Sequence, residues 1–197
     1  MLTDAHRSFD EPGPDERRRA ALLNIAALCG LALSGEALAA LPKRGVVYKP
    51  VLLDPEAFKL TAVLAELIIP ATDTPGALAA GAHRVIDSVL WLCSPLPDQQ
   101  RFTQGLAMID DAARQQHGKK FVALSPARQA ALLHALDTGS APFTPGQRAF
   151  MVQLKTLTLF AYYTSEIGAT RELKYLPVPG GYKGNVPFST IGRRWAL

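Results

Sequence analysis

The chain has 197 residues, a formal net charge of +4 and 48% hydrophobic residues, which is enough for one domain with a core but excludes two large domains joined by linkers. Among the apolar residues, alanine and leucine outnumber the β-branched ones, which favours helices. After residue 39 the longest basic runs are pairs, which argues against a nucleic-acid-binding stripe and a polybasic membrane patch.

The first 39 residues have the order of an export signal. Arginines precede the uncharged run "AALLNIAALCGLAL" at residues 20–33, and an A-x-A site follows at residues 37–39. The run has 14 residues, too few at about 1.5 Å each to cross a hydrocarbon core of about 30 Å. Arg18 and Arg19 before this weakly hydrophobic run predict a twin-arginine signal, with a general secretory signal and an uncleaved N-terminal helix as alternatives. We therefore expect export to the periplasm.

Five helices are predicted between residues 55 and 168, after a linker at residues 40–54. In each segment apolar residues recur with helical spacing, and proline, glycine or an N-cap residue marks the ends. The expected helices run from Pro55 to before Pro70, from the "PATDTPGALAAG" loop to before Pro95, from about Pro97 to Gly118, from Pro126 to Gly139, and from Pro145 to near Gly168. Short connections and the lack of strand patterns predict an all-α fold, a small helical bundle.

Residues 169–197 are predicted to form an extended C-terminal tail. They combine proline, glycine and aromatic residues without a helical stripe or a strand alternation. Two alternatives stay open: the tail covers its own bundle, or it lies along a partner protein with its aromatic side chains as anchors. Glu166, at the end of an aromatic helix, is predicted to form an ion pair or to face a partner. The candidate interface residues are Tyr162, Tyr163, Glu166, Tyr175, Tyr182, Phe188 and Trp195.

A search for catalytic motifs finds none of the common ones. The chain has no G-x-G-x-x-G, no phosphate-binding loop, no G-x-S-x-G, no H-E-x-x-H and no C-x-x-C-H. Cys93, the one cysteine after residue 39, is predicted to be a small buried residue, with an intermolecular disulfide as the alternative. Asp73 is predicted to shape its loop as a turn former. An enzyme would have to use His83, Asp87 and Glu166, an incomplete set, so we predict a non-enzymatic chain with no cofactor or metal of its own.

Two long stretches carry a resemblance to a known family. They are "LIIPATDTPGALAAGAHRVID" (Leu67–Asp87) and "LKTLTLFAYYTSEIGATRELKYLPVPGGYKG" (Leu154–Gly184). Behind a twin-arginine-like leader, they resemble the gluconate 2-dehydrogenase subunit 3 family over about residues 56–190. The resemblance implies a non-catalytic small subunit of a membrane-associated dehydrogenase. Its implied partners are a large FAD-binding subunit of the glucose-methanol-choline (GMC) type, which oxidises a sugar, sugar acid or polyol, and a multihaem cytochrome c subunit.

The same resemblance implies a role in maturation and export of the large subunit, because the small subunit carries the leader. FAD and haem c would then belong to the partners, and this chain would meet the membrane only through the complex. The alternative is a free-standing periplasmic helical interaction protein with no dehydrogenase partner.

Overall fold

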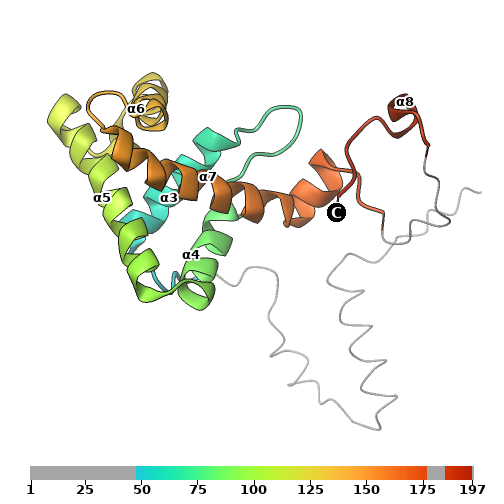
Figure 1. Cartoon of the computed structure of the whole chain (residues 1–197), viewed down its shortest axis with the longest axis horizontal. Helices are drawn as coiled ribbons and strands as arrows, with labels where there is room; N and C mark the ends of the chain where they lie inside the picture. The colour runs from blue at the N-terminus through green and yellow to red at the C-terminus, as the bar shows by residue number, and fades with distance from the viewer. Residues whose placement is uncertain (1–47, 177–184, 197) are drawn as a thin grey trace, which may run out of the picture. The chain divides into compact units, whose positions relative to one another are not determined.

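The computed structural model describes residues 48–176 and 185–196, which fold mainly into helices (Figure 1). The five longer helices are α3 (Pro55–Ile68), α4 (Ala82–Cys93), α5 (Leu96–His117), α6 (Pro126–Thr138) and α7 (Arg148–Tyr163). The shorter elements are the 3₁₀ turns η1 (Phe121–Ala123) and η2 (Pro145–Gln147), the π-helical turn η3 (Gly168–Glu172) and helix α8 (Phe188–Ile191). The described residues contain an isolated β-bridge and no strand. The all-α prediction is confirmed.

Helices α3, α4, α5 and α6 begin and end at the predicted signals, whereas α7 begins at Arg148 rather than Pro145 and ends at Tyr163, before Gly168. The side chain of Asp54 accepts the amide of Ala57 at 2.8 Å, and proline follows it at the first position of α3. Helices α5 and α6 end at Gly118 and Gly139, which both have a φ of +68°, a left-handed conformation that favours glycine. Before α7, Thr144 forms a capping box with the third residue of η2.

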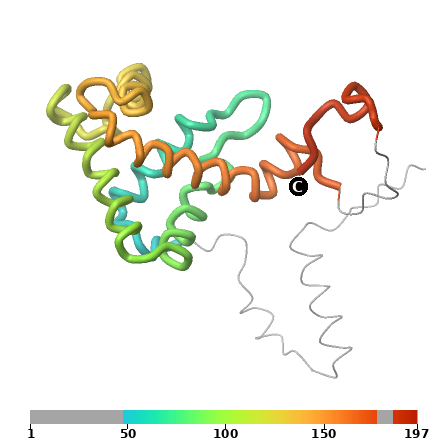
Figure 2. The backbone as a smooth tube through the Cα atoms, viewed as in Figure 1, coloured from blue at the N-terminus to red at the C-terminus, as the bar shows by residue number. Residues whose placement is uncertain are grey.

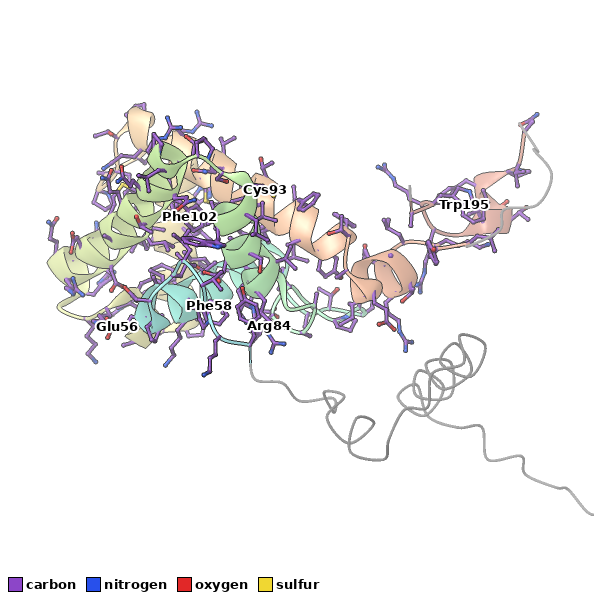
Figure 3. The ribbon with its side chains drawn as sticks, turned by 90° about the horizontal axis from the view of Figure 1, so that it is seen from below. Glu56, Phe58, Arg84, Cys93, Phe102 and Trp195 are labelled. Carbon is purple, nitrogen blue, oxygen red and sulfur yellow. The ribbon has the colours of Figure 1, made fainter. Side chains whose placement is uncertain are left out.

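Helix α7 is the element against which the other long helices pack. It contacts α3, α4, α5 and α6, and Figure 2 shows it running across them. The ring of Phe150 occupies the space beside Gly105 of α5, where a Cβ atom would lie only 2.1 Å from the ring. The same ring meets Phe102, labelled in Figure 3, with 5.4 Å between ring centroids. Glycine at position 105 therefore lets α5 and α7 approach closely.

A buried carboxylate fastens the segment that precedes α3. Asp87 of α4 is fully buried, and its Oδ2 accepts the amide of Val51 at 2.7 Å. Its Oδ1 accepts the amides of Leu52 at 3.2 Å and Leu53 at 2.8 Å. These charge-assisted hydrogen bonds compensate the carboxylate for the water it has lost. They hold residues 51–53 against α4, and Leu53 joins the core.

The prediction that Cys93 is buried is wrong. Cys93 is the last residue of α4, and its side chain is exposed (Figure 3). Helical spacing places it on the face of Ile86 and Leu90, which are buried. The neighbouring Trp91 and Leu92 are exposed as well, so the bundle does not cover the final turn of the helix.

Helical structure also continues beyond its predicted end near Gly168. Helix α7 ends at Tyr163, but η3 then adds a π-helical turn up to Glu172. A Cβ atom on Gly168 would lie 2.0 Å from the carbonyl oxygen of Tyr162. This glycine is therefore needed for close backbone packing, and the first residues of the predicted tail are helical.

Two expectations concern residues outside the described part of the chain. The predicted export signal with Arg18 and Arg19 lies there, and so does Tyr182. No helix among the described residues is long and apolar enough to cross a membrane.

Replacing Asp87 by alanine should lower the free energy of unfolding by about 3 kcal/mol, because three backbone amides would lose their acceptor. Urea denaturation followed by circular dichroism measures this change. Asp111→Ala is the control, since the Asp111 carboxylate is exposed and pairs with Arg114 at 3.0 Å on the surface. The control should cost less than about 1 kcal/mol, and equal losses in both variants would contradict the assigned role of Asp87.

Candidate functional site

The two sequence stretches that carry the resemblance meet at the C-terminal end of α7. The first stretch forms the loop between α3 and α4 (residues 69–81), which lies beside this end of α7 in Figure 1. Tyr162 Oη donates a hydrogen bond to the carbonyl oxygen of Pro75 at 2.9 Å. Thr74 Oγ1 donates to Glu172 Oε2 at 2.6 Å, across 98 positions of sequence. We call residues 69–81 together with residues 162–172 the motif junction.

Glu66, near the end of α3, holds the loop of the motif junction in shape. Its Oε1 accepts the amide of Ala71 at 3.1 Å, and its Oε2 accepts the amide of Leu78 at 2.7 Å. Between these two amides the backbone passes close to the Glu66 carboxylate. A Cβ atom on Gly76 would lie only 2.5 Å from Glu66 Oε1. The loop is therefore folded around a single carboxylate, and glycine at position 76 makes room for it.

Sequence reasoning missed Glu66 and gave the loop-shaping role to Asp73. Asp73 is exposed and its Oδ1 accepts the hydroxyl of Thr72 at 2.9 Å, whereas the loop amides donate to Glu66. One signal for Glu66 was present in the sequence. A negative charge near the C-terminal end of a helix is unfavourable for the helix dipole, so such a residue needs donors from another segment.

Tyr162 is not on the surface, which corrects its place among the interface residues. Its side chain is only 1% exposed, and its hydroxyl is used by Pro75 within the motif junction. Its ring packs edge-on against Tyr163, with 5.3 Å between centroids. A buried tyrosine needs a partner for its hydroxyl, and the loop provides one.

The other described candidates for the interface are exposed. Tyr163 ends α7, Glu166 precedes η3, and Tyr175, Phe188 and Trp195 belong to the tail. The predicted ion pair of Glu166 is not found among the described residues, so its carboxylate is open to solvent there.

The end of the tail folds back onto the residues that follow η3. Lys174 donates its amide to Arg194 O at 2.8 Å and accepts the amide of Ala196 at 3.0 Å. Its Nζ lies 5.0 Å from the ring centroid of Trp195, a cation–π distance. The side chain of Arg193 also donates to the carbonyl of Arg171. The described tail is thus partly ordered by its own contacts, and Trp195 stays exposed on it.

Exposed apolar side chains follow the outer face of α7. Val152 is 57% exposed, Leu159 44%, Phe160 51% and Tyr163 39%. Together with the exposed Thr156, they are spaced by four, three, one and three residues, which places them on one helix face. We call these five residues the α7 stripe. The opposite face of α7 lies in the core, so this helix has apolar residues on both of these faces, and Gln153 and Lys155 lie between them.

The three residues that an enzyme would have to use do not form an accessible catalytic group. Asp87 is buried and occupied by backbone amides, His83 is buried, and Glu166 is exposed beyond the end of α7. Among residues 48–176 and 185–196, no group of three or more histidine, cysteine or acidic side chains is arranged to hold a metal ion.

His83 sits in an apolar setting on α4. Its ring meets Phe58 edge-on, with 4.9 Å between centroids, and its Nδ1 has no hydrogen-bond partner in the described part of the chain. Burial lowers the pKa of His83 below its usual 6.5, and the positive charge of Arg84 lowers it further.

Because the pKa of His83 is lower in the folded state, the unfolded chain takes up its proton first as the pH falls. The free energy of unfolding should therefore decrease between pH 7 and about pH 5. Urea denaturation at both values, for wild type and His83→Gln, measures this effect. The variant should show a weaker dependence on pH, whereas His134→Gln, at an exposed histidine, should keep the wild-type dependence. Identical profiles for wild type and His83→Gln would refute the prediction.

Replacing Glu66 by alanine should loosen the loop of the motif junction, since two backbone amides lose a charged acceptor. We expect a loss of about 2 kcal/mol in the free energy of unfolding and faster hydrogen exchange at Ala71 and Leu78. Glu56→Ala is the matched control on the same helix, because Glu56 is exposed and pairs with Lys120 on the surface. Exchange rates that stay at the wild-type level in Glu66→Ala would show that the carboxylate does not hold the loop.

Comparison with known proteins places the chain in a family. The family described as gluconate 2-dehydrogenase subunit 3 matches residues 55–180, a range that starts at the first residue of α3 and includes the whole motif junction. No curated protein and no solved structure matched the chain. Because the matched range covers well over half of the sequence, the chain belongs to the gluconate 2-dehydrogenase subunit 3 family.

Proposed function

We propose that the chain is the non-catalytic small subunit of a periplasmic, flavin-dependent dehydrogenase. The observation that carries this proposal is the family match over residues 55–180, because the family is named for a subunit of a larger enzyme. The exposed apolar residues on α7 and on the tail support it, since a subunit needs a surface for its partner.

In this proposal the chemistry belongs to other subunits. A large GMC-type subunit binds FAD and oxidises a sugar, sugar acid or polyol, and a multihaem cytochrome c subunit accepts the electrons. The described residues of this chain support such a division, because Asp87 and Glu66 serve as acceptors for backbone amides.

The tail supplies one part of the proposed contact with the large subunit. Tyr175, Phe188 and Trp195 are exposed, and aromatic side chains bury a large area at a small entropic cost. The contacts of Lys174 reduce the freedom of Trp195 before any partner binds. Such pre-ordering lowers the entropic cost of association.

The leader adds a second part to the proposed function, that of an export escort. The twin-arginine route carries folded proteins, so a large subunit without a leader could cross the membrane bound to this chain. The small subunit would then act before the complex reaches the periplasm, and membrane association would arise only through the assembled complex.

Changing Arg18 and Arg19 to lysine should leave both this chain and the large subunit in the cytoplasm, because the translocase reads the arginine pair. The experiment expresses the chain with the proposed GMC-type large subunit from the same organism. It measures both polypeptides, and the dehydrogenase activity, in cytoplasmic and periplasmic fractions. Arg7→Lys, outside the pair, is the control and should leave export unchanged.

A large subunit that reaches the periplasm with the arginine pair changed would refute the escort role. If the large subunit also purifies without this chain and is equally active, the proposal of an accessory subunit fails, and a free-standing interaction protein becomes the better interpretation.

A further inference from the structure

We propose that the α7 stripe packs into an apolar groove on the large, catalytic subunit of the dehydrogenase. This inference rests on the proposed function and adds the surface by which the two subunits recognise each other. The stripe consists of Val152, Thr156, Leu159, Phe160 and Tyr163.

The first argument is the pattern of α7. A helix on the surface of a soluble domain normally has one apolar face and turns polar residues towards water. Helix α7 turns Leu154, Thr158 and Ala161 into its own core, yet the α7 stripe on the opposite face is exposed. The outer face therefore has the composition of an interior surface without a covering element among the described residues.

The second argument is that the threonine hydroxyls in and beside the stripe can lose their water without being left unpaired. Thr156 Oγ1 donates to the carbonyl oxygen of Val152 at 2.9 Å, and Thr164 Oγ1 donates to that of Phe160 at 2.7 Å. Both hydroxyls are therefore already paired inside the helix. Burying an unpaired hydroxyl costs free energy, and this cost is absent for these two threonines, while a partner would have to pair the hydroxyl of Tyr163.

The third argument is the distribution of charge. Arg148 and Lys155 are the charged residues of α7, and both side chains donate hydrogen bonds to Asp137 of α6. Arg148 Nε donates to the carbonyl oxygen of Asp137 at 2.7 Å, and Lys155 Nζ lies 2.6 Å from its Oδ1. The stripe itself has no charge, so a matching surface should be apolar and neutral.

The geometry fits a groove better than a flat surface. From Val152 to Tyr163 the stripe spans about 17 Å along the helix, at 1.5 Å per residue. Anchors spaced by three and four residues are typical of a helix bound in a groove of another protein. The C-terminal anchor, Tyr163, is also part of the motif junction, so a partner can contact both the stripe and the residues that lead into the tail.

Two other occupants fit less well. A helix that lies on a lipid surface has a polar, basic face opposite its apolar face, whereas the face of α7 opposite the stripe is in the core. In a symmetric dimer the four partly exposed apolar residues would bury less than the roughly 800 Å² per partner that a stable interface requires. A large subunit can extend beyond the stripe, and the family is named as one subunit of a larger enzyme.

The test measures binding of the purified large subunit to the mature chain by biolayer interferometry. Leu159→Glu places a charge in the middle of the stripe and should weaken binding at least tenfold. Leu92→Glu is the matched control, because Leu92 is 76% exposed and lies on α4. The control should bind like wild type, and circular dichroism should show that both variants stay folded.

The outcomes separate this inference from the proposed function. If wild type does not bind the large subunit, the proposed function fails and the inference fails with it. If wild type binds and Leu159→Glu binds equally well, or if both leucine variants lose affinity equally, the inference alone is overturned. Two further measurements use the isolated chain. Sedimentation that shows a dimer, dissociated by Leu159→Glu, would assign the stripe to a second copy of this chain. Binding of wild type to anionic vesicles, abolished by Leu159→Glu, would assign it to a membrane surface.

Discussion

The constraint on which the structure depends is that α7 has apolar residues on both faces. Its inner face gives α3, α4, α5 and α6 a common surface, and Gly105 allows the ring of Phe150 to pack directly against α5. A surface helix normally turns polar residues towards water, whereas the exposed face of α7 is largely apolar. The bundle therefore covers one face of α7 and leaves the other exposed.

Carboxylates that accept backbone amides fix the segments between the helices. Asp87 holds the chain that enters α3, and Glu66 holds the loop that leaves it. In both places one acidic side chain replaces the hydrogen bonds that the backbone would otherwise form with water. This arrangement orders irregular segments without strands or disulfides. It also gives Asp87 and Glu66, which lie in or next to the first family stretch, a structural role.

The motif junction connects this local order to the surface. Tyr162 and Glu172 join the end of α7 and η3 to the loop before α4, so segments distant in sequence form one unit. The exposed residues Tyr163 and Glu166 are thereby set on a rigid support, next to the tail. A pre-ordered surface loses less entropy when a partner binds, which suits a subunit of a larger enzyme.

The sequence by itself determined the helices, because spacing of apolar residues and end signals such as Pro55, Gly118 and Gly139 act over a few residues. It also pointed to two stretches, of which the family match includes the first in full and the second up to residue 180. The tertiary structure alone decided which polar and aromatic side chains are used inside. Tyr162 is buried while Tyr163 is exposed, Glu66 shapes the loop where Asp73 was expected to, and Cys93 is exposed although its spacing suggested burial. Each of these outcomes depends on contacts between residues distant in sequence, which periodicity along one helix cannot specify.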